Sequence, residues 1–98
     1  MFTVELPCPG SKSNFLVLKV DLDINTGGLN EVTNNGDCPL FVGALDSSDN
    51  VLSDVEVAPG AFLGHFQPPE GAVSIYAVCH SDCSSTAILV YDDPDLVA

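Results

Sequence analysis

Residues 71–92, which read GAVSIYAVCHSDCSSTAILVYD, decide the fold class of this chain. β-Branched, aromatic and other apolar side chains recur at every second position on both sides of the short stretch His80-Ser81-Asp82. A period of two is that of a β-strand, and apolar side chains on both faces are typical of central strands. We therefore expect a hairpin of two central strands, with Cys79 and Cys83 facing each other where the strands meet.

Short segments with the same alternation recur along the rest of the chain. The strand candidates are residues 2–6, 14–24, 29–33, 39–45, 51–57 and 61–66. Residues 39–45 and 51–57 are separated by a polar loop and could form a hairpin. The Asn35-Gly36 pair after residues 29–33 favours a second tight hairpin turn.

This layout predicts an all-β fold. Seven to eight short strands, separated by turns rich in Gly, Pro and Asn, describe a single antiparallel β-sandwich or a squat barrel over residues 1–98. Periodicity does not encode strand order, so both architectures stay open. We expect the acidic tail, residues 92–98, to be frayed.

The charge of the chain excludes several classes of partner. Fourteen acidic residues stand against Lys12 and Lys19, and the formal net charge is −12. Affinity for phosphates depends on Lys and Arg, so we expect neither nucleic acid nor an anionic membrane surface as a partner. With 46% hydrophobic residues, the chain is nevertheless apolar enough to fold. We see no export signal and no stretch long enough for membrane insertion.

The four cysteines are Cys8, Cys38, Cys79 and Cys83. Cys79 and Cys83 flank the expected hairpin turn, where cross-strand neighbours about 5 Å apart can form a disulfide. Cys8 and Cys38 each precede a proline, which favours extended backbone at a strand end, and they would form the second pair. Two alternatives stay open: small buried thiols that only pack, or one zinc site built from all four thiolates.

Neither histidine completes a catalytic arrangement. His80 follows Cys79 directly, and adjacent residues of a strand point to opposite faces, so they cannot act together as base and nucleophile. His65, between Gly64 and Phe66, is expected to be a half-buried packing residue. No Gly-x-Ser-x-Gly nucleophile elbow occurs. We therefore expect no enzymatic activity and assign no catalytic residue and no cofactor.

Three groups of acidic residues could supply oxygen ligands for calcium, and none matches the spacing of an EF-hand. The main candidate is the loop with Asp46, Asp49 and Asn50. The others are Asp21 and Asp23, two apart on a strand candidate, and Asp92, Asp93 and Asp95 in the tail. The alternative for all of them is a solvated acidic surface that keeps the protein soluble.

In size, strand content, acidity and layout, the whole chain resembles the capsid decoration, or cement, proteins of tailed bacteriophages. The resemblance includes no diagnostic motif and carries over no functional residue. It implies a non-enzymatic structural protein on the virion surface, binding the capsid subunits of the shell through its β-surfaces, with a homo-oligomer as one arrangement.

Two other functions compete with this expectation. One is a ligand-binding module for carbohydrate or calcium, extracellular or on a cell or particle surface; a calcium-dependent rise in melting temperature would favour it. The other is a small zinc-dependent or thiol enzyme, which would need a bound metal or an alkylation-sensitive activity.

Overall fold

The computed structural model describes residues 1–8, 16–20, 28–80 and 82–93, and these contain eight β-strands and no helix. No helix in these ranges is therefore long and apolar enough to cross a membrane. The strands are β1 (Phe2–Leu6), β2 (Leu16–Val20), β3 (Leu29–Asn34), β4 (Leu40–Leu45), β5 (Val51–Val57), β6 (Phe62–Phe66), β7 (Ser74–Cys79) and β8 (Ala87–Asp92).

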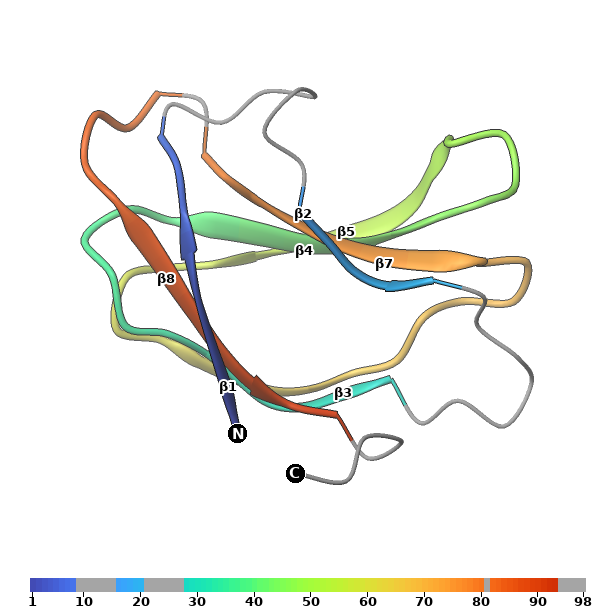
Figure 1. Cartoon of the computed structure of the whole chain (residues 1–98), viewed down its shortest axis with the longest axis horizontal. Coiled ribbons are helices and arrows are strands. Elements are labelled where there is room, and N and C mark those ends of the chain that lie inside the picture. The colour runs from blue at the N-terminus through green and yellow to red at the C-terminus, as the bar shows by residue number, and fades with distance from the viewer. Residues whose placement is uncertain (9–15, 21–27, 81, 94–98) are drawn as a thin grey trace.

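The strands form two antiparallel sheets of four. One has the order β1-β8-β3-β6 and the other β2-β7-β4-β5; we call them the β1 sheet and the β2 sheet. In Figure 1 the strands of the β2 sheet cross the middle of the molecule, β1 and β8 run steeply at an angle to them, and β3 lies below. The expected all-β sandwich is confirmed.

The pairing is nested, and this explains the strand order. β4 pairs with β5, β3 with β6, β2 with β7 and β1 with β8, so the chain forms one long antiparallel ribbon with the β4–β5 hairpin at its tip. The ribbon rolls up because β4 also pairs with β7, and β3 with β8. An eight-stranded double sheet of this kind is a jelly roll. Among the described strands, every connection except β4–β5 crosses from one sheet to the other.

The core lies between the sheets, where alternate side chains of each strand meet. It buries aliphatic side chains of both sheets together with two of the cysteines, one phenylalanine and one tyrosine. Its buried members are Leu6, Leu29, Val32, Cys38, Leu40, Val42, Ala44, Val57, Phe66, Ile75, Ala77, Cys79, Ala87, Leu89 and Tyr91. This alternation is the period-two pattern of the sequence seen in three dimensions.

The expected hairpin across residues 71–92 is wrong. β7 and β8 do not pair with each other: β7 lies between β2 and β4 in one sheet, and β8 lies between β1 and β3 in the other. Their connection is an arch between layers about 10 Å apart. Both strands are nevertheless central in their sheets, which accounts for the apolar side chains on both faces of β7.

The tight hairpin turn expected at Asn35-Gly36 is also wrong, because β3 and β4 belong to different sheets. Instead, this segment lies along the start of β8, where the amide of Asn35 donates to the carbonyl of Ile88 at 2.8 Å. Gly36 is required there: a Cβ would lie 2.5 Å from both the Ile88 nitrogen and the Thr86 oxygen. The Asn-Gly pair thus serves close backbone packing rather than a two-residue turn.

The remaining expectations concern a hairpin, the longest strand candidate and the tail. The hairpin between residues 39–45 and 51–57 is confirmed as β4 and β5. Of the candidate strand 14–24, the described part is β2, and the remainder lies outside the described residues. Of the tail expected to be frayed, Asp92 ends β8 and pairs with the N-terminal ammonium at 3.0 Å, and Asp93 is buried, so the expectation is wrong for these two residues. Residues 94–98 lie outside the described residues.

Candidate functional sites

The cysteines form two disulfides, but not the expected ones. Cys8 is bonded to Cys79, and Cys38 to Cys83. The expected pairs Cys79–Cys83 and Cys8–Cys38 are wrong because Cys79 and Cys83 flank an arch and not a hairpin turn. The nearest sulfur to each comes from a distant part of the chain, namely the end of β1 and the loop before β4.

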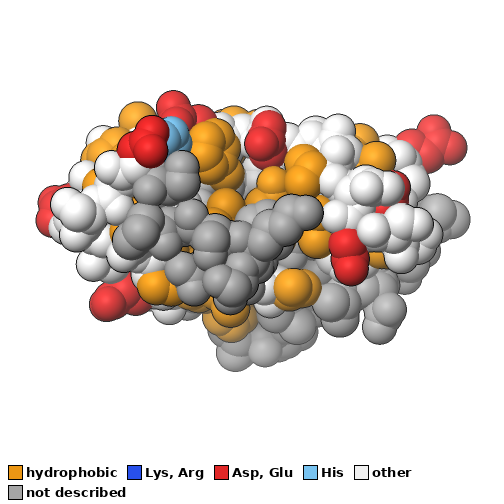
Figure 2. All heavy atoms as spheres, turned by 90° about the horizontal axis from the view of Figure 1, so that it is seen from above, with side chains coloured by type: hydrophobic (Ala, Val, Ile, Leu, Met, Phe, Trp, Pro, Cys, Tyr) orange, Lys and Arg blue, Asp and Glu red, His pale blue; other side chains and the backbone are white. Residues whose placement is uncertain are grey.

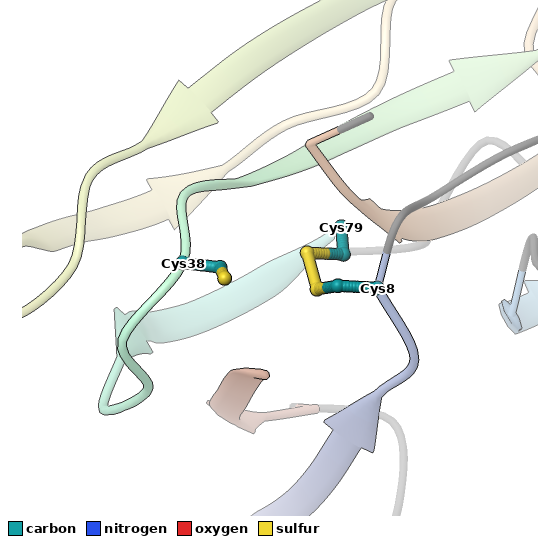
Figure 3. Close-up of side chains that lie close together, drawn as sticks. All are labelled: Cys8, Cys38 and Cys79. Carbon is teal, nitrogen blue, oxygen red and sulfur yellow. A yellow bond between two sulfur atoms is a disulfide. The ribbon is translucent and has the colours of Figure 1, made fainter. Parts of the chain in front are cut away.

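The two disulfides lie beside each other at one end of the sandwich, which we call the cysteine end. The Sγ atoms of Cys8, Cys38 and Cys79 all lie within 4.8 Å of one another. Figure 3 shows the Cys38 side chain pointing toward the Cys8–Cys79 disulfide. Cys38 and Cys79 are buried, and Cys8 and Cys83 are half-buried against the core. Among the described residues, no other His, Cys, Asp or Glu side chains bring three potential ligand atoms together.

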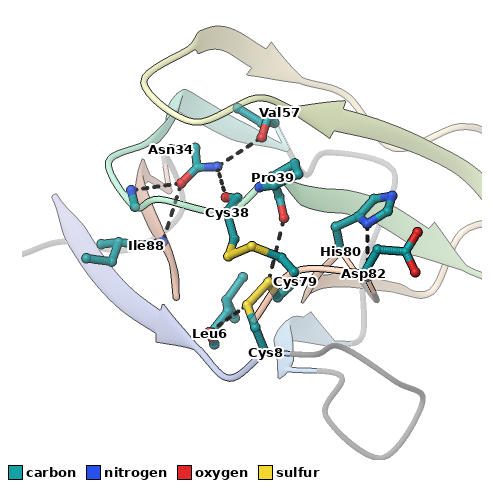
Figure 4. The surroundings of a disulfide bond; sticks show 12 residues. Leu6, Cys8, Asn34, Cys38, Pro39, Val57, Cys79, His80, Asp82 and Ile88 are labelled. Atoms are coloured by element: carbon teal, nitrogen blue, oxygen red, sulfur yellow. Dashed lines mark hydrogen bonds between the residues drawn. A yellow bond between two sulfur atoms is a disulfide. The ribbon is translucent and has the colours of Figure 1, made fainter. Parts of the chain in front are cut away.

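Asn34, which directly precedes the Asn35-Gly36 pair, is a structural residue that the sequence did not single out. Its side chain is fully buried and bridges three segments at the cysteine end (Figure 4). Its Nδ2 donates to the carbonyls of Cys38 (2.7 Å) and Val57 (3.0 Å). Its Oδ1 accepts from the amides of Gly36 (2.9 Å) and Ile88 (3.4 Å). All four hydrogen-bonding positions of the amide are used, as a buried polar group requires.

His80 closes the arch by contacts with three neighbours. Its Nδ1 accepts from the amide of Asp82 at 3.2 Å, so the ring proton lies on Nε2, which is 3.9 Å from Glu56 Oε2. The ring stacks on Phe41 with centroids 5.5 Å apart. These contacts make His80 a packing and capping residue, and the rejection of a Cys79–His80 pair agrees with the bond between Cys79 and Cys8.

The outer face of the β2 sheet carries a second apolar cluster, separate from the core. Its buried members are Leu45, Tyr76 and Val78, and Phe41 packs against them. The strand register places Val17 beside Tyr76 and Val51 beside Leu45 on the same face, and both valines are 48% exposed. Figure 2 looks onto this face and shows hydrophobic side chains with acidic ones around them.

Acidic side chains line the β5 edge of this face. Asp54 pairs in register with Gly43, and Glu56 with Phe41. The Tyr76 ring lies against Gly43, where a Cβ would be 2.6 Å from the ring. Burial, and secondarily the charge of Asp54, raise the pKa of Tyr76 above its ordinary value, so its hydroxyl stays protonated over the neutral range.

The outer face of the β1 sheet carries both polar and apolar side chains. One row of register partners crosses it as Thr3, Val90, Thr33 and Phe62. Phe62 stands at the edge and is 67% exposed. The two sheets therefore share one core but present different surfaces.

His65, at the outer side of edge strand β6, is exposed, so the expectation of a half-buried packing residue is wrong. Its Nδ1 lies 2.6 Å from Asn30 Oδ1 and its Nε2 lies 3.0 Å from Gln67 Oε1. It ties β6 to β3 by hydrogen bonds and not by packing.

In the loop suggested for calcium, the carboxylate of Asp46 forms its hydrogen bonds within the loop. Asp46 Oδ1 accepts from the amides of Ser48 (2.8 Å) and Asn50 (2.9 Å), and Oδ2 lies 3.3 Å from Asn50 Nδ2. These bonds, led by that from Asn50, lower the pKa of Asp46 below its ordinary value of 3.8. Asp46 and Asn50 thus close the β4–β5 turn, and Asp49 takes a left-handed backbone there.

Comparison with models of known families, with curated proteins and with solved structures finds no match for this chain.

Proposed function

We propose that this chain is a non-enzymatic structural protein that decorates a virion capsid. It binds shell subunits through the outer face of the β2 sheet. The observation that carries the proposal is the exposed apolar margin of that face, where Val17 and Val51 are each 48% exposed beside the buried cluster of Leu45, Tyr76 and Val78. A solvated sheet needs only one apolar face, so a second one with half-exposed valines at its margin suits burial against a partner.

The charge of the chain supports a partner of a different kind from itself. Copies that each carry a net charge of −12 repel one another. Asp54 and Glu56 line the proposed contact face, so the complementary surface is apolar at its centre and basic at its rim. The partner we propose is therefore a shell subunit that presents Lys or Arg.

The cross-links and the topology favour the same setting. Disulfides persist on virion and cell surfaces and are rare in the cytosol. The jelly roll is used by many viral capsid proteins, although it is also used by lectins, so the fold supports the class of function by analogy alone.

The proposal is tested first on virus particles purified from the source of the sequence. Quantitative mass spectrometry should find this chain at a fixed ratio to the major shell protein, and it should stay bound through repeated gradient purification. Absence from the particles would refute the capsid assignment.

Rebinding to stripped particles then tests the contact face. Val17→Asp places a charge on the outer face of the β2 sheet without touching the core, and should weaken binding at least about tenfold. Thr3→Asp is the matched control on the outer face of the β1 sheet and should bind as the parent does. Equal binding of the two variants would refute the contact face, even if the chain is a virion component. Added salt should weaken binding of the parent chain.

A further inference from the structure

We propose that the reduced chain binds one Zn²⁺ at the cysteine end, so that a metal ion and two disulfides are alternative cross-links of the same four segments. This inference does not depend on the virion assignment. It rests on the convergence of sulfur atoms from residues that are far apart in sequence.

The geometry is close to that of a four-sulfur zinc site. Zn–S bonds of about 2.3 Å in a tetrahedron place the sulfurs about 3.8 Å apart. Three Sγ atoms, those of Cys8, Cys38 and Cys79, already lie within 4.8 Å of one another. The fourth, that of Cys83, is bonded to Cys38 and therefore lies beside the group. To complete the tetrahedron, the Cys83 sulfur, which is not among the three that lie within 4.8 Å of one another, would have to move toward them.

Backbone hydrogen bonds hold this arrangement in addition to the sulfur–sulfur bonds. The amide of His80 donates to the Pro39 carbonyl at 2.9 Å, which fixes the end of β7 beside the segment that carries Cys38. The amide of Cys38 donates to the Thr86 carbonyl at 3.2 Å, which fixes the start of β8. Asn34 bridges the same segments through the carbonyl of Cys38. These bonds remain available after reduction and favour the approach of the segments that carry Cys38, Cys79 and Cys83.

A bound Zn²⁺ would compensate the charge of thiolates that these surroundings otherwise disfavour. The four cysteines belong to the core or pack against it, and apolar burial opposes a charged thiolate unless a cation is bound to it. Zn²⁺ would satisfy all four sulfurs at once, and the negative charge of the chain favours the approach of a cation.

Thiol–disulfide exchange interconverts the two cross-linked states. A dithiol reductant gives two electrons and two protons to each disulfide and itself becomes a disulfide, so two equivalents free four thiols. Zn²⁺ then displaces the thiol protons as each sulfur coordinates it. Exchange with two equivalents of a small-molecule disulfide takes up the four electrons as dithiol, re-forms the two protein disulfides and releases the metal.

The experiment uses the full chain, reduced with a phosphine under argon and titrated with Co²⁺ and then Zn²⁺. We expect the charge-transfer and d–d absorption of tetrahedral thiolate-bound Co²⁺, displaced by one equivalent of Zn²⁺, and native mass spectrometry should show a 1:1 complex. The oxidised chain should bind neither metal at this site. If the reduced chain is unfolded, Zn²⁺ should restore the β-sheet circular dichroism spectrum.

Variants assign the ligands. Cys8→Ser and Cys38→Ser should each weaken Zn²⁺ binding by at least about tenfold and alter the Co²⁺ spectrum. Asp82→Asn, which removes an exposed carboxylate next to Cys83, is the control and should leave both unchanged. The proposal is overturned if the reduced chain gives no thiolate–Co²⁺ absorption, or if the oxidised chain and the cysteine variants bind Zn²⁺ as tightly as the reduced parent.

Discussion

Two connections of similar length, the β4–β5 turn and the β7–β8 arch, are built by different kinds of interaction. The β4–β5 turn is closed from within, since Asp46 accepts hydrogen bonds from Ser48 and Asn50. The arch is held from outside by partners remote in sequence, such as Cys38, which is 45 residues away from Cys83. Local chemistry determines where a strand turns back on its own sheet, whereas long-range contacts determine where it crosses to the other.

The same difference separates what the sequence predicts from what it does not. Alternating side chains locate the strands, and the polar loop 46–50 makes the β4–β5 hairpin predictable. The alternation of β7 and β8 is equally regular but says nothing about which strand lies beside which. Without the sheet order, the cysteine nearest to Cys79 in sequence is the natural candidate, although the nearest in space is Cys8.

Asn34 escaped prediction for a related reason. It stands before Asn35-Gly36, in a cluster of residues that ordinarily marks an exposed turn. Its burial follows from the carbonyls of Cys38 and Val57 and from the amide of Ile88, which only the folded topology brings together. The one sign of this in the sequence was Gly36, since a glycine can mark a place where two backbone segments approach closely.

Removing the cross-link of the arch should have the largest effect on stability. Replacing both Cys38 and Cys83 by Ala should lower the free energy of unfolding by about 4 kcal/mol, since the bond closes a loop of 45 residues. Urea unfolding of the non-reduced proteins measures the change. The matched variant, in which Cys8 and Cys79 are both replaced by Ala, should lower the free energy of unfolding by a similar amount. A loss below about 1 kcal/mol in both would show that the disulfides do not hold the arch.

Asn34→Ala should come next, with a loss of roughly 2 to 4 kcal/mol, because it leaves two carbonyls and two amides at the cysteine end without their partner. The control is Asn35→Ala, whose side chain is exposed, and it should change little. Thermal and urea unfolding compare the three proteins. Equal stabilities for the two variants would contradict the bridging role of Asn34.

Asp46→Ala should destabilise less than Asn34→Ala, because water can reach the amides that it leaves unpaired. The pKa of Asp46 is lower in the folded chain than in the unfolded chain, so its contribution is present above the ordinary value of 3.8 and is lost as the pH falls through the folded value. The difference in melting temperature between the parent and Asp46→Asn should therefore narrow in acid. A difference independent of pH would show that the charge of Asp46 does not contribute.

Asp49→Gly should have the smallest effect, within about 0.5 kcal/mol. Asp49 has φ 62°, where glycine relieves strain but adds flexibility to the unfolded chain, and the two effects nearly cancel. Asp49→Val should be clearly less stable than Asp49→Gly, because a β-branched residue is strained at this positive φ. If Asp49→Val were as stable as the parent, the turn geometry described for residues 46–50 would be wrong.

The disulfide connectivity of the oxidised chain tests the central claim, that β7 and β8 lie in different sheets, most directly. Non-reducing digestion with an acid protease, followed by mass spectrometry of the linked peptides, identifies the pairs. The jelly roll predicts Cys8 linked to Cys79 and Cys38 linked to Cys83. Peptides that link Cys79 to Cys83 and Cys8 to Cys38 would contradict it and restore the β7–β8 hairpin.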